Sequence, residues 1–126
     1  MLAKLAPIGL VAAGIINLLP VTGVAGASWL RSLYGFEIAS ADLEILLRHR
    51  AVLFGVIGFL LIAAAFRPGL RSVAVLVAGA SMASFIVIAL FVGGYGPAIT
   101  KIVIADLIGL LALVPAVLKP APRTLG

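Results

Sequence analysis

Residues 72–92 have the sequence SVAVLVAGASMASFIVIALFV, in which 21 consecutive positions carry no charged side chain. An α-helix rises about 1.5 Å per residue, so a run of this length crosses the roughly 30 Å hydrocarbon core of a bilayer. A strand of a membrane barrel would alternate apolar and polar residues, and this run does not. The stretch therefore predicts a transmembrane α-helix.

Three further stretches are long and apolar enough to cross the bilayer as helices, and they cover residues 5–24, 43–66 and 98–118. Turn-forming residues separate the last three of the four spans: Arg67-Pro68-Gly69 precedes residues 72–92, and residues 93–97 (GGYGP) follow them. Both loops are short, which favours antiparallel neighbours. We expect residues 1–126 to form one domain, an all-α integral membrane four-helix antiparallel bundle.

The composition indicates that lipid is the solvent of this chain. Hydrophobic residues make up 64% of it and charged residues 10%, whereas soluble proteins have about a quarter charged residues. The chain has no cysteine, one histidine and four acidic residues, too few for a convincing metal cage, so we expect no metal and no cofactor. The basic residues behind the net charge of +5 lie at span ends, which favours membrane orientation over nucleic-acid binding.

The connection over residues 25–42 is the longest and carries the aromatic residues Trp29, Tyr34 and Phe36. Aromatic side chains beside a span favour the headgroup layer of the membrane. We therefore expect a short interfacial helix over residues 28–34, ended by Gly35, and we expect Ser40 to cap the second span.

The distribution of lysine and arginine predicts the orientation, because short cytoplasmic flanks are enriched in both. One expected end of the bundle carries Lys4, Arg67, Arg71, Lys119 and Arg123, and no acid. The other end carries Arg31, Arg48, Arg50 and Lys101 together with Glu37, Asp42 and Glu44. We expect a multi-pass protein of the bacterial inner membrane with both termini in the cytoplasm. A cleaved signal peptide over residues 1–27 is the alternative to a retained first span.

Polar residues inside the spans predict where a site could lie. Asn17 falls in a stripe of small residues with Gly9 and Ala13, so its amide is expected to face the other helices. Asp106 lies well inside its span, where an ionised carboxylate costs at least about 2.5–3.5 kcal/mol. We expect Arg48 to be the ion-pair partner of Asp106, with Lys101 as the second choice.

The predicted polar cluster comprises Asn17, Glu44, Arg48 and Asp106, and its secondary members are Ser84, His49 and Lys101. Glu44 lies one helical turn before Arg48 and can pair with it. A structural role explains the same residues: Arg48 and Asp106 would form a clasp, Asn17 an interhelical hydrogen bond and Ser84 a bond to a backbone carbonyl. His49 and Arg50 are expected to extend towards the lipid headgroups.

Residues 46–55, LLRHRAVLFG, resemble a motif of small bacterial four-helix membrane proteins that are similar in size and layout to the DoxX-like superfamily. Further matching stretches are GIINLLP at 14–20, LYG at 33–35, GGY at 93–95 and AD at 105–106. The resemblance covers most of the chain and implies the fold, but it implies no biochemical role. Such chains sometimes carry the label phosphopantetheine adenylyltransferase. The label does not fit, because that soluble α/β enzyme has a paired-histidine motif and this chain has one histidine.

No nucleophile–base pair and no phosphate-binding loop is visible in the sequence, so we name no catalytic residue. The favoured function is that of a non-enzymatic membrane protein. It would be an accessory subunit, or it would bind a small lipid-like molecule through the polar cluster in the outer-leaflet half. The expected partners are the bilayer and either a larger membrane complex or further copies of the chain, and not nucleic acid. The alternatives are a proton-coupled or small-solute transporter, with Asp106 as the titrating group, and a membrane-embedded enzyme.

Overall fold

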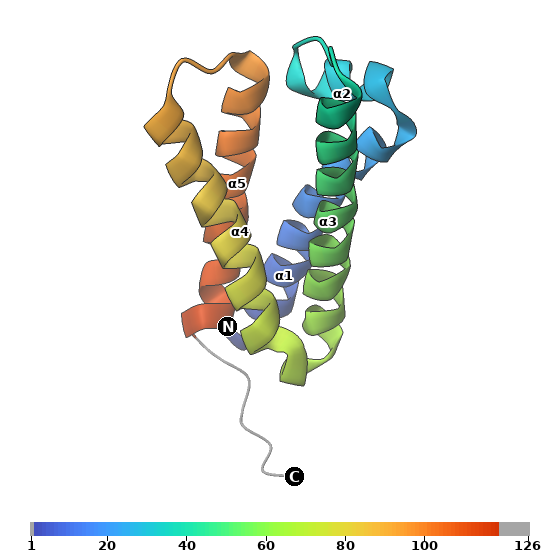
Figure 1. The fold of residues 1–126 in the computed structure, drawn as a ribbon. Coiled ribbons are helices and arrows are strands. Elements are labelled where there is room, and N and C mark those ends of the chain that lie inside the picture. Colours follow the sequence, from blue (N-terminus) through green and yellow to red (C-terminus); the bar gives the residue numbers. More distant parts are fainter. Residues whose placement is uncertain (1, 119–126) are drawn as a thin grey trace.

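The computed structural model describes residues 2–118, which are almost entirely helical and contain no strand (Figure 1). Four helical segments are long and apolar enough to cross a membrane: Lys4–Ala25, Ala41–Phe66, Pro68–Val92 and Pro97–Leu118. The prediction of an all-α protein with four such helices is therefore confirmed. Lys119 and Arg123, which entered the predicted charge asymmetry, lie outside the described residues.

The first span consists of two kinds of helix. The α-helix α1 (Leu2–Leu18) continues directly into η1 (Leu19–Ala25), a 3₁₀-helix. Pro20 explains the change, because its nitrogen carries no hydrogen and its ring clashes with the carbonyl four residues earlier in an α-helix. The span itself agrees with the predicted residues 5–24, but the sequence analysis did not predict the tighter second part.

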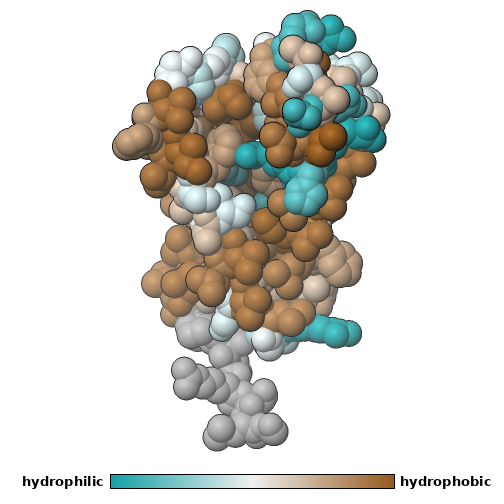
Figure 2. All heavy atoms as spheres, viewed as in Figure 1, coloured by the Kyte–Doolittle hydropathy of each residue, from teal (hydrophilic) through white to brown (hydrophobic). Residues whose placement is uncertain are grey.

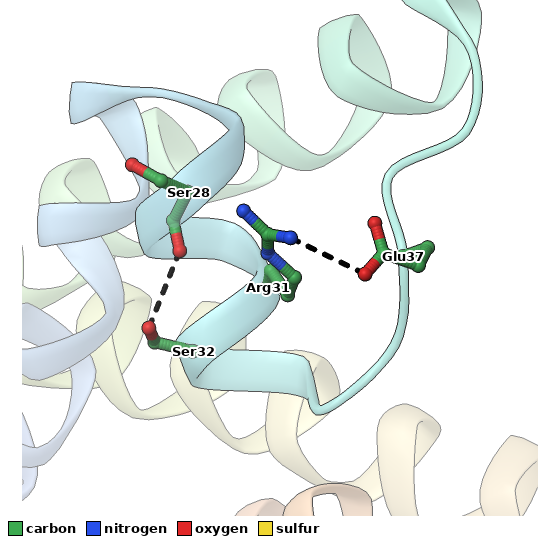
Figure 3. Close-up of polar contacts among 4 residues, drawn as sticks. All are labelled: Ser28, Arg31, Ser32 and Glu37. Carbon is green, nitrogen blue, oxygen red and sulfur yellow. Dashed lines mark hydrogen bonds and ion pairs between the residues drawn. The ribbon is translucent and has the colours of Figure 1, made fainter.

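A short helix follows the first span, close to the predicted residues 28–34. This helix, α2 (Ala27–Tyr34), ends at Gly35, whose φ of 74° lies in the left-handed region that favours glycine. Figure 3 shows that the Ser32 hydroxyl donates a hydrogen bond to the Ser28 carbonyl (3.2 Å). In the same view, Arg31 Nη1 lies 3.3 Å from Glu37 Oε1, which ties α2 to the linker leading into the next helix.

The remaining spans begin and end close to the predicted positions. Helix α3 (Ala41–Phe66) is capped by Ser40, whose hydroxyl accepts a hydrogen bond from the Leu43 N–H (3.1 Å), as predicted. The 3₁₀-helix η2 (Pro68–Leu70) joins α3 to α4 (Arg71–Val92). Gly93 and Gly94, both with positive φ, start the connection to α5 (Pro97–Leu118).

Helix α1 packs against both α3 and α5, and α4 packs against α5 and α3. The contacts of α1 rely on glycine: a Cβ on Gly9 would collide with the Ala112 carbonyl of α5, and a Cβ on Gly58 of α3 would lie 2.8 Å from the Gly14 carbonyl of α1. The predicted small-residue stripe of the first span is buried, which confirms that it faces other helices.

Large apolar side chains cover most of the outer surface. Phe91, Phe66 and Phe59 are 91%, 78% and 73% exposed, respectively. Figure 2 shows apolar residues over much of the face in view and polar residues gathered at the end that carries α2. Such a surface suits a lipid solvent and not water.

Candidate functional site

A cavity of about 570 Å³ lies between the first span, α2 and α5, and we call it the α1–α5 cavity. Its volume is within the range of about 300–1,000 Å³ that is typical of small-molecule sites. Its walls are mostly apolar, with a few polar groups. The lining residues are Ile16, Asn17, Leu19, Pro20, Ser32, Leu33, Gly35, Phe54, Pro97, Ala98, Lys101, Ile102, Ala105 and Asp106.

Asn17 places an unsatisfied acceptor at this cavity. The residue is 2% exposed, and its Nδ2 donates a hydrogen bond to the Ala13 carbonyl (2.9 Å) and lies 3.9 Å from the Met82 sulfur. Its Oδ1 is buried and has no hydrogen-bond partner among residues 2–118. Leaving such a group unpaired costs about 1–3 kcal/mol. The amide nitrogen of Asn17 therefore binds its own helix, while the amide oxygen has no partner among residues 2–118.

Asp106 lies on the same cavity wall and is 5% exposed. The residue belongs to the inward face of α5, between Val103 and Gly109, which are both buried at three-residue steps. Among residues 2–118, no cation lies within 4.0 Å of its carboxylate and no hydrogen bond to it is formed. Two acceptor groups without protein partners thus meet in one cavity.

The predicted Arg48–Asp106 ion pair is not formed. Arg48 Nε instead donates a hydrogen bond to the Val24 carbonyl (3.0 Å), and its Nη1 lies 3.5 Å from Glu44 Oε1. The carbonyl belongs to the last turn of η1, where helix carbonyls lack a partner within the helix, so it attracts the guanidinium. The Glu44–Arg48 pair is confirmed, but the Arg48 side chain is 47% exposed and does not line the cavity.

Arg50 takes the inward position that was expected of Arg48. Its Cζ lies 4.8 Å from the ring centroid of Phe54 and 4.5 Å from that of Phe85, and its Nε is buried without a hydrogen-bond partner. Arg50 therefore packs against a second helix, α4, a contact that the sequence analysis did not predict. The four-residue spacing of Arg50 and Phe54 was a signal for the contact between those two residues.

The secondary residues of the predicted cluster are distributed over different places. Lys101 is exposed and lines the α1–α5 cavity, but it forms no ion pair with Asp106 in the described chain. His49 is exposed, as expected for a residue in contact with solvent or headgroups. Ser84 donates to the Ser81 carbonyl (3.0 Å), the bond that a structural role predicts, and lies on a different cavity.

Residues 2–118 hold no group of three or more His, Cys, Asp or Glu side chains that could bind a metal ion. The chain matches no protein-family model, no curated protein and no solved structure. The resemblance to DoxX-like proteins thus stays a prediction, and the geometry of the site has to carry the functional argument.

Proposed function

We propose that this chain is a multi-pass protein of a bacterial inner membrane that binds a small amphiphile in the α1–α5 cavity. One observation carries the proposal: Asn17, whose buried Oδ1 has no hydrogen-bond partner among residues 2–118, and the buried Asp106, which forms no ion pair within that range, line the same mostly apolar cavity. Sites of this kind are the usual places where small apolar ligands are oriented by a few polar contacts.

The proposed placement in the membrane follows from the surface and the charges. The four spans alternate in direction as an antiparallel bundle, and α2 lies in the headgroup layer with Trp29 and Phe36 exposed. The end that carries Lys4, Arg67 and Arg71 faces the cytoplasm together with both termini. The α1–α5 cavity then lies in the outer-leaflet half.

The chemistry of the cavity defines the ligand. Because Asn17 Oδ1 and the oxygens of the Asp106 carboxylate are hydrogen-bond acceptors, a ligand whose polar end donates hydrogen bonds suits this cavity. A hydroxyl or an amine does so. The apolar walls, with Leu33, Phe54 and Ile102, suit a short alkyl or ring system.

The test uses 1-dodecanol that carries a photoreactive diazirine, added to the purified chain in detergent. Asp106→Leu removes the carboxylate at similar volume, and we expect photolabelling to fall by at least about tenfold, because a charge-assisted hydrogen bond is lost. Mass spectrometry of the labelled peptides is expected to place the label on residues that line the cavity, such as Ile102 and Ala105.

The matched control is Glu44→Gln, which alters a carboxylate outside the cavity and is expected to leave labelling unchanged. Circular dichroism confirms that each variant stays helical. Equal labelling of the Asp106→Leu variant and the unmodified chain would refute the proposed site.

The same buried carboxylate supports a second candidate, a proton-coupled or small-solute transporter in which Asp106 binds and releases a proton. Reconstituted vesicles separate the two functions. The binding function predicts a proton flux no greater than in empty vesicles, whereas a flux that disappears in Asp106→Asn would favour transport.

A further inference from the structure

A second cavity lies between α3 and α4, and we call it the α3–α4 cleft. Its volume is about 220 Å³, and its lining residues are Arg50, Leu53, Phe54, Ile57, Ser81, Ser84, Phe85 and Ile88. Figure 1 shows α3 and α4 close together at the η2 end and further apart at the other end. Phe54 contributes to both cavities, but Asn17 and Asp106 do not line the cleft.

Arg50 supplies the cleft with a cation that lacks a close counterion. Among residues 2–118, the ion pairs within 4.0 Å involve Arg31 and Arg48, and neither includes Arg50. The rings of Phe54 and Phe85 lie against the guanidinium, while its buried Nε has no hydrogen-bond acceptor. Aromatic rings stabilise the charge but accept no conventional hydrogen bond from the edge of the guanidinium. The arrangement therefore leaves room for an oxygen anion.

The rest of the lining indicates what else that anion carries. Ser81 of α4 adds a hydroxyl group to the lining, whereas the Ser84 hydroxyl already donates to the Ser81 carbonyl, and Leu53, Ile57 and Ile88 form an apolar wall. Ile88 and Leu53 are 61% and 48% exposed, so this wall continues onto the surface that faces lipid. Arg50 and Ser84 lie about 12–14 Å below the ends of α3 and α4 near α2, a depth that a long arginine side chain and local thinning of the bilayer connect to the headgroups.

We propose that the α3–α4 cleft binds the phosphate of an anionic phospholipid, with the Arg50 guanidinium as the cation and the apolar wall along one acyl chain. Arginine suits this ligand because its planar donor groups match phosphate oxygens. This site is distinct from the α1–α5 cavity, although Phe54 lines both, because Asn17 and Asp106 do not line it and it takes a ligand of opposite polarity.

Native mass spectrometry of the chain, released from detergent with equal amounts of phosphatidylglycerol and phosphatidylcholine, tests the proposal. The unmodified chain is expected to retain phosphatidylglycerol at least about tenfold better, and Arg50→Gln is expected to abolish this preference. Arg48→Gln is the matched control, because it removes the same charge two residues away from a side chain outside the cleft. It is expected to retain the preference.

Ser81→Leu provides a second variant if Arg50→Gln does not fold, since it fills the cleft and keeps the arginine. The preference for phosphatidylglycerol is expected to fall in this variant as well. The proposal is overturned if the unmodified chain shows no preference, or if Arg50→Gln and Arg48→Gln lose it equally. Inorganic phosphate, added at the same concentration as the lipid, distinguishes a lipid headgroup from free phosphate as the source of the anion. Displacement of the lipid would show that the site takes free phosphate.

Discussion

The helices pack differently at the two ends of the molecule. Near η2, small residues and a few large ones form a buried apolar cluster, and we call this part the packed half; the cluster includes Ala6, Leu10, Ala13, Leu61, Ala64, Ala65, Ala74, Ala78, Met82, Leu113 and Ala116. Near α2, in the part that we call the open half, the α1–α5 cavity and the α3–α4 cleft separate the helices and polar groups line the gaps. The packed half therefore holds the helices together, and the open half is where a ligand can enter.

The largest effect is expected where two helices touch through a glycine of the packed half. Gly9→Ala places a methyl group against the Ala112 carbonyl, and the required backbone shift is expected to lower the free energy of unfolding by about 2–3 kcal/mol. Gly79→Ala is the control, because a Cβ there meets open space and alanine is the better helix former. Thermal unfolding in detergent measures both, and equal stability of the two variants would contradict the comparison.

The same substitution in the two halves of α5 is expected to give different results. Ala116 is 4% exposed and belongs to the packed cluster, so Ala116→Leu is expected to overpack it and destabilise the protein by about 1–3 kcal/mol. Ala105→Leu extends into the α1–α5 cavity, and it is expected to keep stability within about 0.5 kcal/mol while reducing binding of the dodecanol probe. Thermal unfolding and photolabelling, measured on both variants, separate these outcomes.

The Asp106 carboxylate, which we propose to bind the ligand, is expected to lower the free energy of unfolding. Asp106→Leu replaces a buried carboxylate that has no close partner by an apolar side chain of similar volume, which is expected to stabilise the protein by about 1 kcal/mol. Chemical unfolding in detergent checks the sign. A loss of stability would mean that the carboxylate holds helices together and that the structural role is correct.

The smallest effects are expected from the exposed ion pairs near α2. The Arg31 and Glu37 side chains are 55% and 76% exposed, and such pairs contribute about 0–1 kcal/mol. A double-mutant cycle of Arg31→Ala and Glu37→Ala is expected to give a coupling energy below about 0.5 kcal/mol, and salt is expected to reduce it further. A larger coupling would mean that the linker after α2 is more important for the open half than its exposure indicates.

The sequence was sufficient to predict the four long apolar helices and the inward position of two polar residues. Asn17 was expected to face inward because small residues surround it at helical spacing, and Asp106 because it lies deep in an apolar span; both are buried on one cavity. The choice between Arg48 and Arg50 could not be made in this way. The two residues are about 200° apart around α3, and their positions depend on the end of η1 and on Phe85, a residue of another helix.

The most direct test of the proposed binding site is the mass spectrum of small molecules extracted from the chain after purification from its native membranes. The account predicts that the unmodified chain and the Glu44→Gln control each carry a hydroxyl- or amine-bearing apolar molecule, and that Asp106→Leu does not. The same set of bound molecules in all three preparations would contradict it.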